Sequence, residues 1–196
     1  MKTKWFCAAG AVLLTALAVL SLFTGKYPLT FEGLLAGDEM QRRVFWTLRA
    51  SRTAVGVVGG FALGAAGFVY QTVFRNPLAS PDVIGVSSGA SAGAAFGILF
   101  LSGAASVTAA SFAGALAAVG LSLALSALDR SGRQGTIVLA GIAVHALAQT
   151  ALMAFKLTAD PERELASIEY WIMGSLNGIS GYSIGGNLAL CAACLA

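Results

Sequence analysis

The chain has 196 residues, of which 57% are hydrophobic and only 11% are charged, and its mean hydropathy is +0.80. An ordinary soluble domain carries about 25% charged residues, so this composition excludes a typical water-soluble globular protein. Twelve Lys and Arg against nine Asp and Glu leave a net charge of +3, which is too small to indicate a nucleic-acid partner. Because the charges cluster between apolar runs, we expect an all-α integral membrane protein.

The first apolar run, residues 5–24, follows a basic start and is long enough to cross a bilayer, which needs roughly 20 apolar residues. A basic start and a short apolar core also describe a secretory signal peptide. No convincing small-residue cleavage site follows, and further apolar runs come later. We therefore predict an uncleaved first helix whose N-terminus lies inside.

The longest polar stretch, residues 25–52, separates this run from the second predicted span, residues 53–74. Three glycines in the second span have GxxxGxxxG spacing, which favours close packing of membrane helices. They are Gly56, Gly60 and Gly64. The polar side chain of Gln71 lies near the end of this span.

A charged turn with two prolines follows, with the sequence RNPLASPD over residues 75–82. Proline removes a backbone donor and stops a helix, while Asn and Asp satisfy exposed turn groups. We therefore favour a structural role for four residues of this turn, namely Asn76, Pro77, Pro81 and Asp82. The alternative is a non-helical element beside a translocation path, which is tolerated at membrane depth only inside protein or beside water.

The third predicted span, residues 83–101, has a glycine at every fourth position, so its glycines share one helix face. An interior glycine costs a soluble helix about 1 kcal/mol, whereas in a membrane small residues let helix backbones approach closely. We predict helix packing by Gly85, Gly89, Gly93 and Gly97. The span begins with polar residues, including Ser87 and Ser88, so we expect its start to lie inside the protein.

Further apolar runs predict spans at residues 107–128, 136–155 and 179–196. Residues 156–175 are polar and amphipathic, with Tyr170 and Trp171 suited to a membrane interface. The last apolar run reaches the end of the sequence without a flanking polar residue. We therefore expect about six spans, the last of them truncated.

Polar side chains inside the predicted spans are candidates for a translocation path, because such residues are often functional. The candidates are Gln71, Ser87, Ser88, His145 and Gln149. His145 and Gln149 are four residues apart and share a helix face; the alternative role for each is an interhelical hydrogen bond. A lone histidine is not a metal site, and no GxxxxGK[ST] phosphate loop occurs. We expect no catalytic site and no metal site.

The basic residues do not follow the positive-inside rule for a chain whose N-terminus lies inside. Five would lie inside, namely Lys2, Lys4, Arg75, Arg130 and Arg133. Seven would lie outside, namely Lys26, Arg42, Arg43, Arg49, Arg52, Lys156 and Arg163. We therefore expect the outer arginines to have another role.

Several motifs together identify a family. They are LRASR at 48–52, Gln71 followed by RNPLASP at 75–81, GVSSGA at 85–90, LAGIA at 139–143 and YWIMGSL at 170–176. In order and spacing they resemble the FecCD family of ABC-importer permeases, which take up iron–siderophores, haem or cobalamin. The resemblance covers essentially the whole chain.

The resemblance implies a fold and a set of partners. The chain is expected to be the N-terminal half of a ten-helix permease in the bacterial inner membrane, with a cytoplasmic N-terminus. The expected partners are a second permease subunit (identical or different), two cytoplasmic ATPase subunits, a periplasmic or lipid-anchored substrate-binding protein, and membrane lipid. The permease itself is expected to hold no cofactor, because the ATPase subunits use the ATP. Arg49 and Arg52 match the family's docking points for acidic residues of the binding protein.

One departure from the family pattern is that the cytoplasmic coupling segment, a GExxAxxLG-like motif, is not reached by this chain. The chain as given is therefore expected to lack the main ATPase contact. A structural or assembly protein rich in small residues is the alternative function, although it would not require the NPLAxP turn or the arginine pair. A membrane-embedded enzyme would need an acid, base or metal cluster, which the spans do not show.

Overall fold

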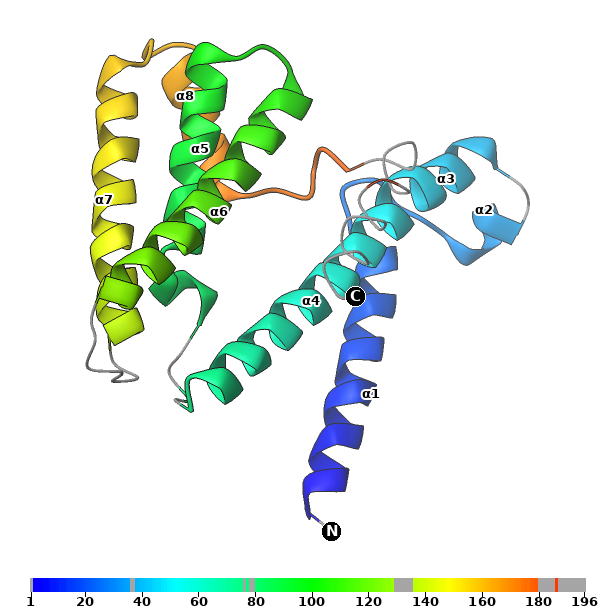
Figure 1. Ribbon diagram of the computed structural model, residues 1–196. Helices are drawn as coiled ribbons and strands as arrows, with labels where there is room; N and C mark the ends of the chain where they lie inside the picture. The colour runs from blue at the N-terminus through cyan, green and yellow to red at the C-terminus, as the bar shows by residue number, and fades with distance from the viewer. Residues whose placement is uncertain are drawn as a thin grey trace. The chain divides into compact units, whose positions relative to one another are not determined.

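The computed structural model describes residues 2–35, 38–75, 77, 80–128, 136–179 and 186, and it contains no strand among them. This agrees with the predicted all-α fold. The elements, in chain order, are α1 (Lys2–Phe23), α2 (Phe31–Leu35), α3 (Glu39–Arg43), the π-helix η1 (Val44–Ala50), α4 (Ser51–Val73), the 3-10 helix η2 (Pro81–Ile84), α5 (Val86–Phe100), α6 (Ala104–Leu128), α7 (Thr136–Thr158) and α8 (Glu164–Met173) (Figure 1).

Four helical stretches of the described residues are long and apolar enough to cross a membrane. They are Lys4–Phe23, Glu39–Val73, Ala104–Leu128 and Thr136–Thr158. Helix α5 has 15 residues, fewer than the roughly 20 that a bilayer requires, because η2 and Gly85 occupy the start of the range predicted as the third span. Apart from residues 179 and 186, the range predicted as the sixth span lies outside the described residues.

The chain divides into two compact units. Unit 1 comprises Met1–Ala65 and Leu176–Ala196, and unit 2 comprises Ala66–Ser175. Unit 1 contains α1 to η1 and most of α4, whereas unit 2 contains η2 and α5 to α8. Each unit contains an irregular helical turn, η1 in unit 1 and η2 in unit 2. Some candidate residues lie in unit 1 and the others in unit 2.

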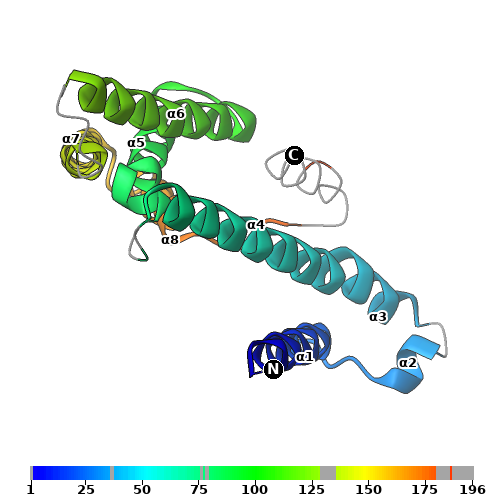
Figure 2. The same cartoon turned by 60° about the horizontal axis from the view of Figure 1, so that its bottom comes forward.

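Helix α5 is the centre of unit 2, because it contacts α6, α7 and α8 (Figures 1 and 2). The core between α5, α7 and α8 consists of Ala95, Leu152, Ala159 and Ile168. Close to this core, the ring of Phe155 lies 6.1 Å from that of Phe96 and 6.3 Å from that of Phe100, measured between centroids. An ion pair of 2.9 Å between Lys156 Nζ and Glu169 Oε1 joins α7 to α8.

Glycines allow α5 and α6 to pack backbone against backbone. A Cβ atom at Gly89 would lie 2.6 Å from the carbonyl oxygen of Gly114, and one at Gly97 would lie 2.9 Å from Val107 Cα. A Cβ at Gly93 would overlap the carbonyl oxygen of Ala110. Contacts this short leave no room for a methyl group, so these three positions of α5 require glycine.

The other predicted packing glycines are placed differently. Gly85 lies before α5 rather than on its face, because its φ of 85° belongs to the left-handed region that glycine adopts readily. A Cβ at Gly56 would meet Leu176 Cδ1 at an ordinary 3.6 Å, whereas at Gly60 and Gly64 it would meet no atom of the described residues within 4 Å. A packing role for Gly60 and Gly64 therefore stays a prediction.

We expect Gly93→Ala to destabilise the protein by about 1–3 kcal/mol, because the added methyl group overlaps the Ala110 carbonyl in a packed interface. Gly120→Ala on α6 is the matched control, since a Cβ there meets nothing within 4 Å, and it should be neutral or stabilising by up to about 1 kcal/mol. Thermal unfolding in detergent measures both. Equal stability of the two variants would contradict this account of the α5–α6 contact.

Candidate functional site

Unit 1 contains the two predicted docking arginines at a π-helical turn. Isolated π-helical turns inside helices are rare and occur frequently at functional sites. Arg49 lies in the last turn of η1, and Arg52 lies in the first turn of α4. Between them, Ser51 is 1% exposed and donates its hydroxyl to the carbonyl oxygen of Trp46 at 3.0 Å, five residues earlier. This hydrogen bond fixes the turn that places both arginines.

Arg49 caps the C-terminus of α1. Its Nη1 donates to the carbonyl oxygen of Leu22 at 3.1 Å, and its Nη2 donates to the carbonyl oxygen of Tyr27. The last four carbonyls of a helix have no intrahelical partner, and a cation there also interacts favourably with the helix dipole. The rings of Phe23 and Phe45 pack beside this contact, with centroids 6.4 Å apart. The guanidinium group and the ring pair together hold α1 against η1.

Gly25 provides the space for the Arg49 side chain. A Cβ atom at Gly25 would lie 2.8 Å from Arg49 Nη2 and 3.0 Å from Arg49 Cζ. A larger residue at this position would displace the guanidinium group. The position of Arg49 therefore depends on a glycine 24 positions earlier in the chain.

Arg52 reaches the segment that follows α8. Its Nη2 donates to the carbonyl oxygen of Asn177 at 2.8 Å, across 125 residues of sequence. Its Nε is buried and has no hydrogen-bond partner among the described residues. Both arginines are half-buried, and their neighbours Arg42 and Arg43 on α3 are exposed. The two guanidinium groups are therefore held near the surface by backbone carbonyls, with donors left for a further acceptor.

Unit 2 contains the second irregular turn, in which η2 leads through Gly85 into α5. Pro81 is the first residue of η2, and the side chain of Asp82 is exposed. Ser122 of α6, which is fully buried, donates its hydroxyl to the carbonyl oxygen of Ile84 at 3.0 Å. Ser88 donates to the carbonyl oxygen of Gly85, also at 3.0 Å. The Gly85 carbonyl also accepts from the Gly89 N–H at 2.9 Å, whereas the Ile84 carbonyl is satisfied by the Ser122 hydroxyl.

Helix α7 closes on the same turn at Gly141. A Cβ atom there would lie 2.6 Å from the carbonyl oxygen of Val83 and 2.8 Å from Ile84 Cα. Sequence reasoning did not single out Gly141 or Ser122. A serine inside an apolar 25-residue helix and a glycine at the centre of LAGIA were the available signals.

The five predicted path residues all belong to unit 2, and they differ in exposure. Gln71, Ser87 and Gln149 are exposed, His145 is half-buried, and Ser88 is buried in the turn just described. An apolar groove of about 300 Å³ between α5, α6 and α7 is lined by small and apolar residues and by none of the five. The described residues therefore do not gather these side chains into one cavity, and their role in a path stays a prediction.

The residues of the RNPLASPD turn are only partly described. Asn76 lies outside the described residues, and Pro77 is exposed. Arg75 has a φ of 46°, in the left-handed region, where α4 has ended. The chain thus changes direction at Arg75, directly before the predicted turn residues.

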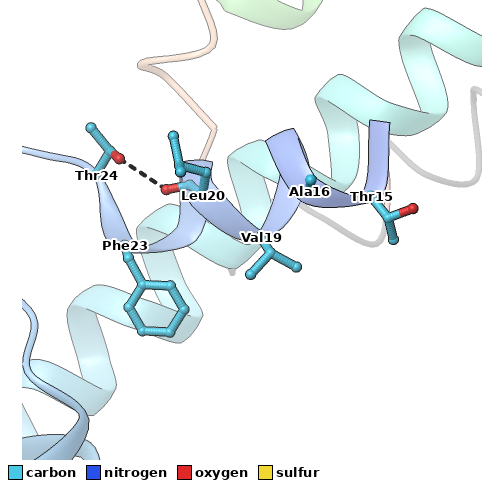
Figure 3. Close-up of a pocket in the computed structure, with 6 residues that line it drawn as sticks. All are labelled: Thr15, Ala16, Val19, Leu20, Phe23 and Thr24. Carbon is cyan, nitrogen blue, oxygen red and sulfur yellow. Dashed lines mark hydrogen bonds between the residues drawn. The ribbon is translucent and has the colours of Figure 1, made fainter. Parts of the chain in front are cut away.

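A depression of about 590 Å³ along the end of α1 is lined by Thr15, Ala16, Val19, Leu20, Phe23 and Thr24 (Figure 3). The Thr24 hydroxyl donates to the carbonyl oxygen of Leu20 at 2.9 Å, so this polar group is already paired (Figure 3). The described part of the chain contains no group of three or more His, Cys, Asp or Glu that could hold a metal ion.

The four long apolar helical stretches of the described residues define a helical membrane-spanning protein. The sequence profile of the FecCD transport family matches residues 13–196, and the chain belongs to that family.

Curated relatives include a cobalamin import permease, BtuC, of Halobacterium salinarum, which is 37% identical over 71% of this chain and 38% of its own length. The achromobactin transport permease CbrC of Dickeya dadantii is 35% identical over 86% of this chain and 50% of its own length. A solved structure of a metal-chelate type ABC transporter in an inward-facing conformation matches this chain with a TM-score of 0.81 and 26% sequence identity. The match covers 94% of this chain and 57% of the transporter chain. The chain spans about half the length of the relatives it matches.

We expect Ser122→Ala to destabilise unit 2 by about 1–3 kcal/mol, because it leaves the buried Ile84 carbonyl without a partner. Thr108→Ala is the matched control on the same helix, since that exposed hydroxyl bonds only to Ala104 of its own turn. Thermal unfolding of the two variants measures the difference. A control that is as destabilised as Ser122→Ala would contradict the proposed pairing.

Proposed function

We propose that the protein carrying this chain is the permease subunit of a binding-protein-dependent ABC importer for iron chelates or cobalamin. The observation that carries the proposal is the family match over residues 13–196. The relatives named for cobalamin and for the siderophore achromobactin give the substrate class. The multi-pass chain would reside in the bacterial inner membrane with its N-terminus in the cytoplasm.

The energy for transport would come from partner subunits. The chain has no GxxxxGK[ST] phosphate loop, so we propose that two cytoplasmic ATPase subunits bind and hydrolyse ATP. A second permease subunit, identical or different, would complete the translocation path. The permease would then contribute binding surfaces and helix rearrangement rather than covalent chemistry.

Docking of the substrate-binding protein is proposed at Arg49 and Arg52. The arginine fork matches a carboxylate bidentately, and partly desolvated pairs of this kind fix orientation and register. Two features of unit 1 support the proposal: both side chains are half-buried rather than fully enclosed, and Arg52 Nε has no partner in the described part of the chain. Exposed Arg42 and Arg43 would contribute only long-range attraction.

The translocation path is proposed to include Gln71, Ser87, His145 and Gln149, with Ser88 supporting the turn beside it. Exposed amides on apolar helices α4 and α7 support this assignment, because an amide in hydrocarbon needs water or a polar partner. The bulky substrates after which the relatives are named suit a largely apolar path better than a tight coordinating site.

We expect the double variant Arg49→Glu/Arg52→Glu to reduce binding-protein association and chelate uptake by at least about tenfold, because like charges then face the docking carboxylates. Arg42→Glu/Arg43→Glu is the matched control with the same change of charge on exposed positions, and it should change uptake much less. Association is measured with the purified complex and uptake with labelled chelate. Unaffected association in the first variant would show that docking lies elsewhere.

A further inference from the structure

We infer that Arg49 and Arg52 form a latch that a docking carboxylate opens. The carbonyl latch is the set of hydrogen bonds from Arg49 to the Leu22 and Tyr27 carbonyls and from Arg52 to the Asn177 carbonyl. In the undocked protein it ties two other segments of unit 1 to η1 and α4. The carboxylate replaces these carbonyls and releases both segments. This inference rests on the docking function proposed above.

The latch holds segments that have little regular structure of their own. Residues 24–30 connect α1 to α2 without a helix, and residues 25–28 are exposed. Residues 176–179 follow α8 and contain a turn in which the Ile179 N–H donates to the Leu176 carbonyl. Helix α1 itself packs on η1. The arginines therefore connect these segments to the long helix Glu39–Val73, beside the contact of 3.3 Å between the Ser21 and Thr53 hydroxyls.

The exchange is favourable because the two kinds of acceptor differ in charge. Hydrogen bonds from a guanidinium group are charge-assisted with either acceptor, but only a carboxylate adds an opposite charge and accepts from two guanidinium donors in a bidentate pair. The carbonyls in the latch are neutral acceptors. Once released, the Tyr27 carbonyl lies in an exposed stretch where water replaces the lost hydrogen bond. A delivered carboxylate therefore competes successfully for the guanidinium group.

The Arg52 guanidinium group uses only part of its capacity to donate hydrogen bonds. Its Nη2 is engaged with the Asn177 carbonyl, while the adjacent Nε is buried and unpaired in the described part of the chain. A carboxylate that accepts from Nε and Nη2 together gives both donors a partner. The same carboxylate displaces the Asn177 carbonyl, which frees the segment after α8.

Docking of the binding protein therefore itself releases the two chain segments. Binding at Arg49 loosens the C-terminus of α1, and binding at Arg52 loosens the segment that follows α8. Both changes originate at the π-helical turn, which Ser51 holds in place. A signal that a loaded binding protein has arrived would thus pass directly to two chain segments.

The test measures hydrogen exchange by mass spectrometry on the protein carrying this chain, reconstituted with its partner subunits in lipid nanodiscs. The probe is the purified substrate-binding protein of the importer. On docking, we expect exchange in residues 22–24 and 176–179 to become faster by about tenfold, although a bound partner ordinarily slows exchange at its interface. Faster exchange in these two segments supports the latch.

Gly25→Ala opens the latch without removing a charge, because its methyl group displaces the Arg49 guanidinium. We expect this variant to exchange faster at residues 22–24 without the probe, and to bind the probe at least as tightly as the unchanged protein. Gly10→Ala on α1 is the matched control, since a Cβ there meets nothing within 4 Å. Arg49→Gln should exchange faster and also bind the probe at least about tenfold more weakly.

The outcomes separate the latch from the docking function. Binding of the probe with unchanged or slower exchange in both segments overturns the latch and leaves docking intact. Equal exchange in Gly25→Ala and Gly10→Ala without the probe also overturns the latch. Failure of the unchanged protein to bind the probe overturns the docking proposal, and it therefore also overturns the latch, which rests on docking.

Discussion

Pairing of backbone carbonyls at irregular turns is the constraint on which this structure depends. An apolar chain in a membrane has no water with which to satisfy carbonyls that leave a helix, so side chains have to supply the donors. At the turn formed by η2 and Gly85, the donors are the hydroxyls of Ser122 and Ser88. At η1 they are the hydroxyl of Ser51 and, for the segments packed against it, the guanidinium groups of Arg49 and Arg52.

The two turns use different hydrogen-bond donors, and the kind of donor decides whether a group from outside can compete for the bond. A buried serine hydroxyl makes one neutral hydrogen bond that nothing from outside competes for, and Gly141 brings the α7 backbone against this turn at Val83 and Ile84. An arginine also donates to carbonyls, but its donors are charged and some of them are spare. The η2 turn is therefore suited to a fixed support, whereas the η1 turn is suited to exchange with a charged partner. This contrast supports the proposal that the binding protein docks on unit 1.

Sequence patterns located the helices and the residues of interest but not their contacts. Apolar runs predicted spans where α1, α4, α6 and α7 lie, whereas the third predicted span begins with η2 and Gly85 and the sixth lies almost wholly outside the described residues. Glycine spacing marked the face of α5 that meets α6. The same spacing included Gly85, whose left-handed conformation depends on the turn before the helix rather than on helical periodicity. The partners of Arg49 are carbonyls 22 and 27 residues away, and the partner of Arg52 is a carbonyl 125 residues away. Every residue carries a carbonyl, so no sequence pattern marks these partners. Ser122 was equally invisible, because a serine in a membrane helix most often bonds to its own turn.

Pairing of the arginine side chains at η1 with backbone carbonyls lasts until a docking partner replaces these carbonyls. Solid-state NMR on the protein in lipid measures it directly, with ¹⁵N in the arginine side chains and ¹³C in the carbonyls of Leu22 and Asn177. Without a partner, we expect dipolar coupling from Arg49 to Leu22 and from Arg52 to Asn177, and we expect the binding protein to remove both couplings. Absence of these couplings in the undocked protein, with the guanidinium groups in contact with water or lipid headgroups instead, would contradict the account.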